Sequence, residues 1–396
     1  MAIRLSGDGT EGPQEFRPAG PEALIYICGI TPYDASHLGH VATFLSYDVL
    51  VRRLAELGHK ARVVRNITDL DDPILPRARQ LGVPYEELAD SEVAQFHQDM
   101  AGLGMLQPAA EPRVSTMVEQ VIEFIEALDA AGYSYRLDGT VYFDVSRSAT
   151  FGRLSGYSED LMLHLSRERG GDPDNLKKRN RLDFILWRPS LEGEPSFDSP
   201  FGRGIPGWHI GCSAMARDLL GATVDLHGGG VDLVFPHHES ELAQTMALQQ
   251  EPFARHWHHC EFVSYRGTKM SKSLGNIVLA RDLLRRHDWR AIRLAVLRQY
   301  RYRGGFEWRD HDIVLGERLL GLLLEAVRRP SGPDPRPWAE RVRAAIDDDL
   351  DFPTAVAELE NLARGMLTAG EDPTAPAELA ELAGLLGVDL GRGSAG

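Results

Sequence analysis

Apolar positions along the first third of the chain fall into two alternating patterns, short continuous runs and longer helical stretches. The run ALIYIC is followed by the helical stretch LGHVATFLSYDVLVRRLAELG, and the run KARVVRNI is followed by a second helical stretch over residues 90–104. Strand, helix and strand in this order predict a βαβ unit, which typically begins a parallel nucleotide-binding sheet. Residues 1–20 are rich in Gly and Pro and are expected to form a loose lead-in.

The middle of the chain predicts an interruption of this sheet. Residues 115–132 read as an amphipathic helix that ends at Gly, and the strand TVYFDV and the polar loop SRERGGDPDNLKKRNR follow it. The sheet then resumes with GATVDLHGGG and ARHWHHCEFVSY, which are separated by a helix beginning at PHHESELAQTMALQQ. Beyond the KMSKS segment the pattern predicts helices over 279–300, 311–328, 338–347 and 353–368.

These patterns predict an α/β fold, in which a Rossmann-like parallel sheet is split by an insertion and followed by a C-terminal helical bundle. We expect residues 1–114 to form the first half of the catalytic domain and residues 115–205 to form an inserted connective segment. Residues 206–275 would complete the catalytic domain, and residues 276–396 would be a helical region without an anticodon-binding domain.

Composition narrows the class of protein. A net charge of −15 over 396 residues disfavours a broad nucleic-acid surface. No apolar run reaches the roughly 18 residues of a membrane span, and the N-terminus lacks a charged-then-apolar signal pattern. Three widely spaced cysteines favour a reducing cytoplasm over a disulfide framework. We therefore expect a cytoplasmic protein with no membrane partner.

Two segments carry candidate phosphate chemistry. The first strand leads through CGITPYDASHLGH into a helix, and a strand–turn–helix junction presents free N–H groups to phosphates. His37 and His40 are three residues apart and so face the same side of that helix. KMSKS contains Lys269 and Lys272, two of only five lysines in a chain with 38 arginines. Compact ammonium groups suit the charge that develops when a triphosphate is attacked, although a solvated loop would also carry lysines.

A metal site is the second candidate. Cys28 ends the first strand, Cys212 lies near a helix start, and His237 and Glu241 share a helix face at i and i+4. Two thiolates, an imidazole and a carboxylate suit tetrahedral Zn²⁺, but the spacing also fits unrelated buried residues. The cluster His256-Trp257-His258-His259-Cys260 is predicted to be structural, because alternate strand residues face opposite sides.

HLGH and KMSKS resemble the two signatures of class I aminoacyl-tRNA synthetases. The segments YICGITPYD, RNITDLDDPI, ERGGDP, PGWHIGCSAM, HGGGVDLVFPHHESE and DDDLDFPTA narrow the resemblance to the cysteine branch. This branch includes the cysteinyl-tRNA synthetases and the cysteine ligases of mycothiol biosynthesis, which join cysteine to the amine of glucosaminyl-inositol. The resemblance implies a split Rossmann domain, ATP with Mg²⁺ as substrate, and one Zn²⁺ per chain.

The resemblance also assigns roles to individual residues. It implies that His37, His40, Lys269 and Lys272 are catalytic, and that a metal-bound thiolate selects the substrate cysteine. Asp232 would bind the α-ammonium group, whereas residue type alone makes Trp208 a core aromatic and Thr68 a strand-end hydroxyl. The implied zinc ligands are Cys28, Cys212, His237 and Glu241; the implied substrate contacts are Cys28, Gly29, Ile30, Thr31, Asn66, Ile67, Thr68, Trp208 and Asp232; the implied nucleotide contacts are Thr43, Gly228, Gly229, Gly230 and Val263.

Both families would first form cysteinyl-adenylate and pyrophosphate, so the acceptor separates them. CGITPYDASHLGH, TDLDDP and the final LLGVDL read closer to the ligases, and the tail has the wrong charge for gripping RNA. We expect a monomer that ligates L-cysteine to glucosaminyl-inositol and binds no tRNA. Gly211 departs from the Glu of the tRNA enzymes, whereas Glu241 is more typical of them. The alternatives are a compact cysteinyl-tRNA synthetase, a paralogue using another amine, and an inactive synthetase-like binding protein.

Overall fold

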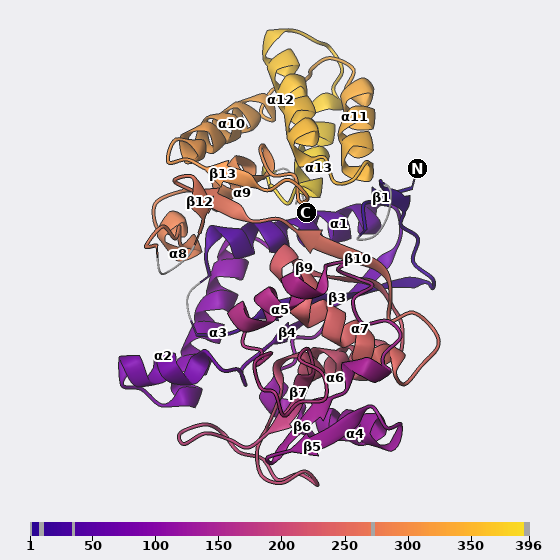
Figure 1. The fold of residues 1–396 in the computed structure, drawn as a ribbon. Coiled ribbons are helices and arrows are strands. Elements are labelled where there is room, and N and C mark those ends of the chain that lie inside the picture. The colour runs from indigo at the N-terminus through magenta and orange to yellow at the C-terminus, as the bar shows by residue number, and fades with distance from the viewer. Residues whose placement is uncertain (1, 8–11, 34–35, 271–273, 392–396) are drawn as a thin grey trace.

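A four-stranded parallel sheet forms the centre of the computed structural model, which describes residues 2–7, 12–33, 36–270 and 274–391 (Figure 1). Its order is β10-β9-β3-β4, so β3 and β4, which precede the insertion, lie beside β9 and β10, which follow it. All three pairings are parallel, which confirms the predicted split sheet. Its strands are β3 (Glu22–Ile30), β4 (Lys60–Ile67), β9 (Val224–Gly230) and β10 (Ala254–Cys260).

Helices cover both faces of this sheet and enclose two hydrophobic cores. Side chains of α1 (Leu38–Glu56) join the C-terminal helices in one core, whereas α4 (Val118–Ala130) and α6 (Trp208–Leu220) contribute to the other. Within this sheet β3 reads as a nearly continuous apolar run, as a strand covered on both faces does, whereas β4, β9 and β10 also carry Arg, Asp, His or Gly. The other helices of this region are α2 (Ile74–Leu81), α3 (Tyr85–Gly102), α7 (Glu239–Met246) and the short η1 (Val114–Thr116), η3 (Val231–Leu233) and η4 (Val234–His238).

The inserted segment contains an antiparallel sheet in the order β5-β6-β7-β8. Its polar loop is fastened by the buried Asp183 carboxylate, which accepts hydrogen bonds from Tyr135 Oη and the backbone N–H groups of Val145 and Asn180, each over 2.8 Å. These bonds give the charged loop a fixed path to the central sheet. The elements are β5 (Ser134–Leu137), β6 (Thr140–Phe143), η2 (Val145–Arg147), α5 (Glu159–Glu168), β7 (Phe184–Arg188) and β8 (Ile205–Pro206).

The predicted strand over 254–265 is wrong as a single element. β10 ends at Cys260, and the chain then enters a separate three-stranded sheet in the order β12-β11-β13. This break redirects the chain toward the KMSKS segment. The strands are β11 (Val263–Tyr265), β12 (Thr268–Lys269) and β13 (Phe306–Trp308), and a small antiparallel pair near the N-terminus is formed by β1 (Arg4–Leu5) and β2 (Gln14–Glu15).

The C-terminal part is helical, but the predicted helix over 279–300 is two helices. Asp288 interrupts it, because its carboxylate accepts a hydrogen bond from Arg290 N over 2.9 Å and caps a new helix. No helix of the described residues is long and apolar enough to cross a membrane. The helices are α8 (Ala280–Leu284), α9 (Trp289–Leu297), α10 (Asp312–Ala326), α11 (Arg336–Asp347), α12 (Phe352–Thr368) and α13 (Ala375–Leu385).

Candidate active site

A cavity of about 660 Å³ lies where the carboxyl ends of β3 and β9 meet the N-terminus of α1 and the inserted segment. This is the edge at which α/β sheets bind ligands. Many of the residues chosen from the sequence share this cavity although they come from β3, α1, α6, β9, η3 and β12 and the adjoining turns. They are Cys28, Gly29, Ile30, Thr31, His37, His40, Thr43, Trp208, Gly230, Asp232 and Lys269.

The remaining predicted residues lie elsewhere. Asn66, Ile67 and Thr68 are buried at the end of β4, and Val263 is buried in β11. None of these four lines the cavity. Lys272 lies outside the described residues. Cys212, His237 and Glu241 are buried directly behind the cavity wall formed by Cys28.

His37 and His40 form the first turn of α1. The Nδ1 atom of His37 accepts a hydrogen bond from Gly39 N over 3.1 Å, and His37 N donates to Nδ1 of His40 over 3.4 Å. The two rings stack with their centroids 4.0 Å apart. Side chains that cap a helix N-terminus stand beside its partial positive charge, which is where an anionic phosphate is stabilised.

Lys269 reaches the same cavity from the other side. Its Nζ atom lies 3.6 Å from Oδ2 of Asp232 and 3.4 Å from the centre of the Phe262 ring. Asn276 fastens the chain where it returns from KMSKS, because its Nδ2 donates to Thr268 Oγ1 over 2.9 Å and to Lys269 O over 3.2 Å. The lysine is therefore held beside the residue that was predicted to bind an ammonium group.

Gly29 and Asn66 hold the floor of the cavity together. Gly29 N donates to Asn66 Oδ1 over 3.0 Å, and Asn66 Nδ2 donates to Thr68 Oγ1 over 2.9 Å. A Cβ atom at Gly29 would lie 1.8 Å from Asn66 O, so only glycine permits this approach of β3 to β4. Asn66 and Thr68 thus support the cavity from behind.

The glycine run after β9 is shaped by packing. A Cβ atom at Gly228 would lie 2.2 Å from Tyr47 Oη and 2.7 Å from His258 O. At Gly229 it would lie 2.7 Å from Leu233 Cδ1. Of the three predicted nucleotide-contacting glycines, Gly230 lines the cavity. The protein itself therefore occupies the space beside Gly228 and Gly229.

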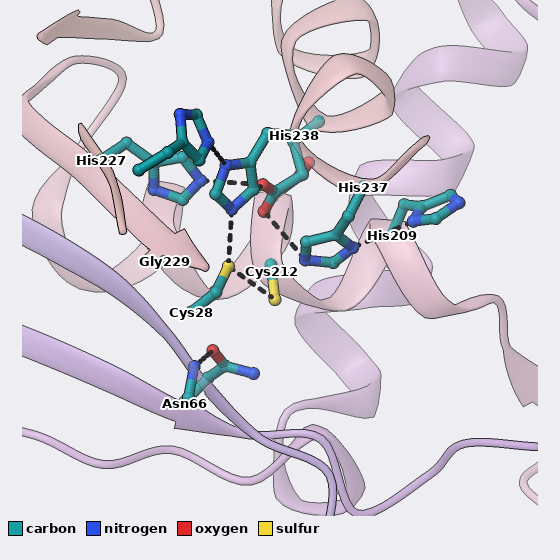
Figure 2. A network of polar contacts seen from close by, with 12 residues as sticks. Cys28, Asn66, His209, Cys212, His227, Gly229, His237 and His238 are labelled. Atoms are coloured by element: carbon teal, nitrogen blue, oxygen red, sulfur yellow. Dashed lines mark hydrogen bonds and ion pairs between the residues drawn. The ribbon is translucent and has the colours of Figure 1, made fainter. Parts of the chain in front are cut away.

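The four predicted metal ligands converge, and Figure 2 labels three of them, Cys28, Cys212 and His237. Cys28 comes from β3, Cys212 from α6, His237 from η4 and Glu241 from α7, and their ligand atoms all lie within 4.8 Å of one another. The two Sγ atoms are 4.0 Å apart. Two thiolates on one tetrahedral Zn²⁺ are separated by about 3.8 Å, because each Zn–S bond is about 2.3 Å long. The donor set therefore fits a zinc ion in both chemistry and spacing.

A layer of histidines, which the sequence interpretation missed, surrounds this group. His209 Nδ1 lies 3.0 Å from His237 Nδ1, which leaves Nε2 of His237 facing Glu241 at 3.9 Å. His227 Nε2 lies 2.8 Å from Glu241 Oε2, and His238 Nε2 lies 3.3 Å from Cys28 Sγ. Partners of this kind orient metal ligands. Each of these histidines stands next to a residue already chosen from the sequence. His209 follows Trp208, His227 precedes the glycines, and His238 follows His237.

Two donor sets are thus close enough to hold a metal among the described residues. Both contain Cys28 and Glu241; one adds Cys212 and His237, and the other adds His227 and His238. The first offers two soft thiolates to zinc, whereas the second offers one. The structure thus brings together the set chosen from the sequence and shows that Glu241 is common to both.

Burial sets the protonation of this group. It lowers the pKa of His227 to about 3, and it lowers the pKa of His237 well below its usual value, with His209 adding to that effect. Burial raises the pKa of Glu241 well above its usual value, and burial together with Cys212 raises the pKa of the Cys28 thiol. The imidazoles are therefore neutral, as metal ligands must be, while the acids hold their protons until a cation compensates them.

The second cluster stays apart from both donor sets. His258 is buried and stacks on Tyr302 with ring centroids 4.1 Å apart, and Cys260 is a buried free thiol. His259 and Trp257 are exceptions, because His259 Nε2 lies 2.6 Å from Nδ1 of His238 and the Trp257 ring centroid lies 4.8 Å from that of His227. The strand alternation explains why neighbouring members of the cluster point to different surroundings.

The inserted segment closes the cavity with charged residues that were not chosen from the sequence. Arg169 donates to the carbonyl oxygens of Asp232 and Phe235, and so connects the ERGGDP loop to the turn that follows β9. Arg188 forms ion pairs with Asp72 and Glu194 at 2.7 Å. Asp71, Asp72, Arg169 and Arg188 all line the cavity. Asp71, Asp72 and Arg169 lie in two quoted segments, TDLDDP and ERGGDP, whereas Arg188 lies in neither.

One protein family and several known proteins are similar to this chain. Residues 16–317 match the family of tRNA synthetases class I (C) catalytic domain. The chain is 43% identical over 392 residues to the L-cysteine:1D-myo-inositol 2-amino-2-deoxy-alpha-D-glucopyranoside ligase of Thermobispora bispora, covering 98% of this chain and 96% of that one. The ligase of the same name from Streptosporangium roseum is 44% identical over 385 residues, covering 96% and 94%.

Solved structures support the fold. The methionyl-tRNA synthetase of Mycobacterium tuberculosis, in complex with methionyl-adenylate, superposes with a TM-score of 0.64 at 17% identity, covering 92% of this chain and 88% of that one. The LeuRS of Agrobacterium radiobacter K84 gives a TM-score of 0.64 at 13% identity, covering 96% and 86%. The chain therefore belongs to the L-cysteine:1D-myo-inositol 2-amino-2-deoxy-alpha-D-glucopyranoside ligase family and is an ATP-dependent ligase built on the class I synthetase catalytic domain.

Proposed function

We propose that this enzyme activates L-cysteine with ATP and then joins it, through an amide bond, to the amine of glucosaminyl-inositol in mycothiol biosynthesis. The position of Cys28 carries the first half of this proposal. Cys28 belongs to the four-donor group and also lines the cavity that contains His37, His40 and Lys269. A substrate cysteine whose thiol is held at that group would place its carboxylate within the cavity where phosphates are expected.

Zinc is the proposed metal, one per chain, with Cys28, Cys212, His237 and Glu241 as its ligands. When bound, it would supply a soft Lewis acid that takes a substrate thiolate and rejects a hydroxyl or methyl group. Glu241 as a ligand is supported by its complete burial and its 3.9 Å separation from His237. The fully buried acids also favour a cation at this point.

The protein's own groups would carry out the activation step as follows. The cysteine carboxylate attacks the α-phosphate of ATP, delivered with Mg²⁺, and pyrophosphate leaves. His37 and His40 at the start of α1, with Lys269 and Lys272, bind and stabilise the phosphates. Asp232 binds the α-ammonium group of cysteine, and Trp208 and Thr31 enclose the amino acid. The remaining proposed contacts are Gly29, Ile30, Asn66, Ile67 and Thr68 for the substrate and Thr43, Gly228, Gly229, Gly230 and Val263 for the nucleotide.

The proposed domains follow the same division as the chemistry. Residues 1–114 and 206–275 would form the catalytic domain, residues 115–205 the connective segment, and residues 276–396 a helical region without an anticodon-binding domain. The relatives' shared name supports the sugar acceptor, because they cover nearly the full chain. We propose a cytoplasmic monomer that uses no tRNA, which the three free, buried cysteines and the acidic charge support.

Paired assays test this function. Purified protein with ATP, Mg²⁺ and cysteine would receive glucosaminyl-inositol in one reaction and tRNA for cysteine in the other. We expect the mass of cysteinyl-glucosaminyl-inositol in the first and uncharged tRNA in the second. Charged tRNA without amide product would instead identify a compact cysteinyl-tRNA synthetase. Absence of both products and of cysteine-dependent ATP–pyrophosphate exchange would identify an inactive synthetase-like protein.

A further inference from the structure

Asp71 is a cavity carboxylate whose hydrogen bonds come from uncharged groups. Thr31 Oγ1 donates to its Oδ2 over 3.0 Å, and the backbone N–H of Asp72 donates to its Oδ1 over 2.9 Å. The segment is held in place by Tyr85, whose Oη donates to Asp69 O over 3.0 Å and accepts from Asp71 N over 3.1 Å. Asp71 is therefore fixed in position, and no described residue forms an ion pair with it.

The other cavity carboxylates are occupied differently. Asp232 lies beside Lys269, Asp72 pairs with Arg188, and Asp183 is used by the loop of the insertion. Glu168 faces His164 at 3.4 Å on an exposed part of α5, Glu261 accepts a hydrogen bond from Phe262 N over 3.3 Å, and Asp172 is exposed in the loop of the insertion. Asp71 is partly buried and shares the cavity with Cys28 and Trp208, where the activated cysteine is proposed to lie. It is thus the carboxylate best placed to meet an incoming cation beside the cysteine site.

From this geometry we infer that Asp71 binds the ammonium group of the acceptor and removes its proton, which makes it the general base of the amide-forming step. This inference rests on the proposed function. An amine attacks an acyl group only through a free lone pair, and a primary ammonium group at neutral pH has none. The acceptor would enter between the Asp71–Pro73 segment and the inserted strand β7, which carries Arg188.

The step balances as follows. The acceptor ammonium gives one proton to the Asp71 carboxylate, and its lone pair attacks the carbonyl carbon of cysteinyl-adenylate. A C–N bond forms and the C–O bond to the phosphate breaks, with the electron pair leaving on AMP. The second nitrogen proton passes to a phosphate oxygen of the departing AMP. The products are the amide, protonated Asp71 and AMP, and no further reactant is required.

The electrostatic surroundings suit this role. Burial raises the pKa of Asp71 to about 7, and the Thr31 hydrogen bond opposes part of that rise. Asp72 adds to the rise, whereas Arg188 of β7 opposes it. A base works best when its pKa lies near the operating pH. The charged groups that act on the carboxyl group are Asp72 and Arg188, and Tyr85, which accepts a hydrogen bond from Asp71 N, is itself acted on by Asp69 and Glu194.

Asp71→Asn tests the inference, because asparagine retains an oxygen for the Thr31 bond and loses the base. Cysteine-dependent ATP–pyrophosphate exchange should stay within about threefold of the native enzyme. Single-turnover transfer from preformed cysteinyl-adenylate to glucosaminyl-inositol should fall about 100-fold or more, as loss of a general base does. The native transfer rate should rise with pH through about 7, and this rise should be absent from the variant.

Two matched variants separate a base from a merely structural residue. Asp72→Asn, at the neighbouring exposed carboxylate, should keep the pH-dependent rise. Thr31→Val removes the hydrogen bond that favours ionised Asp71, so the rise should move to higher pH. Hydroxylamine, an amine that is uncharged at neutral pH, should accept cysteine from the Asp71→Asn enzyme at close to the native rate.

The failures are distinguishable. If the native enzyme exchanges pyrophosphate but forms no amide with glucosaminyl-inositol, the proposed acceptor is wrong, and the role of Asp71 falls with it. If the native enzyme forms the amide and Asp71→Asn transfers at the native rate with the same pH profile, the role of Asp71 alone is overturned. Equal losses with hydroxylamine and glucosaminyl-inositol would also overturn it, because a neutral nucleophile needs no base.

Discussion

Asp48 and Glu241 are two buried carboxylates in very different surroundings. Asp48 in α1 pairs with Arg293 of α9 and Arg52, and its Oδ1 accepts a hydrogen bond from Leu106 N over 2.8 Å. Burial alone would raise the pKa of Asp48, but Arg293 and Arg52 hold it below its usual value. Glu241 lies among histidines and thiols, and burial raises its pKa well above the usual value.

The difference distinguishes a buried ion pair that stabilises the fold from buried acids that can bind a metal. Arg293 also donates to the carbonyl oxygens of Leu103 and Leu386, so the Asp48 pair fastens α1 to the C-terminal helices with its charge compensated by the chain. The Glu241 group contains acids and neutral imidazoles but no cationic side chain from the chain's own Lys or Arg among its described contacts. Such a group is stable as an anion only when a cation from outside the chain joins it.

Removing one donor of the Glu241 group should have the largest effect. Cys212→Ser should abolish stoichiometric zinc, measured by atomic emission on the purified protein, and should lower cysteine-dependent pyrophosphate exchange by more than about 100-fold. Cys260→Ser is the matched control, since Cys260 is equally buried but lies outside both donor sets. One zinc per chain in Cys212→Ser would contradict the ligand assignment and would favour the set with His227 and His238.

Breaking the Asp48 pair should affect stability and leave the metal in place. Asp48→Asn leaves Arg293 buried without its partner, and such a loss costs about 3–5 kcal/mol in the free energy of unfolding. Urea denaturation measures it, and zinc content should be unchanged. The surface pair of Arg341 with Glu358 provides the control, and Arg341→Met should change the free energy of unfolding by about 0.5 kcal/mol or less. Zinc loss in Asp48→Asn would show that the two regions are coupled.

The same pair predicts how stability depends on pH. The folded-state pKa of Asp48 is depressed, so its contribution is fully present above the unfolded-state value of about 3.9 and is lost as pH falls through the lower folded-state value. The difference in free energy of unfolding between native protein and Asp48→Asn should therefore be constant near neutrality and shrink in acid below about pH 4. If the difference in free energy of unfolding persists unchanged into strong acid, asparagine destabilises the protein at position 48 for steric reasons.

Much of the fold followed from apolar periodicity. Each of the four strands of the central sheet overlaps a predicted segment, although β3 runs from Glu22 to Ile30 and so extends beyond the apolar run predicted over 23–28. The helices α2, α5 and α13 were not predicted, and two further errors fell where one polar side chain or one turn overrides the apolar pattern. Asp288 divides the helix predicted over 279–300, and the turn after Cys260 divides the last strand between two sheets. Such local caps and breaks are weak signals beside long apolar stretches.

Site residues of a rare type could be predicted from the sequence. Site residues of a common type could not, because only the folded geometry gives them a role. Cysteines, lysines in an arginine-rich chain and the His37/His40 pair stand out in the sequence. Asp71 does not, because one aspartate among many becomes distinctive only when folding buries it against Thr31. The histidine layer was hidden for a similar reason. His209, His227 and His238 lie in different elements, and the packing of α6, β9 and η4 brings them together.

The smallest expected effect concerns Gly211, which replaces a Glu of the tRNA enzymes. Gly211 is buried in α6, and a Cβ atom there would lie 3.1 Å from Val114 Cγ2, away from the cavity-lining residues. Alanine gains about 1 kcal/mol in helix propensity but must displace the Val114 side chain slightly. Gly211→Ala should therefore change the free energy of unfolding by less than about 1 kcal/mol and leave the ratio of amide formation to pyrophosphate exchange unchanged. A selective loss of amide formation would place this position in the acceptor site. If instead Gly211→Ala stabilises the protein only when Val114→Ala is also present, packing against Val114 is what constrains this position.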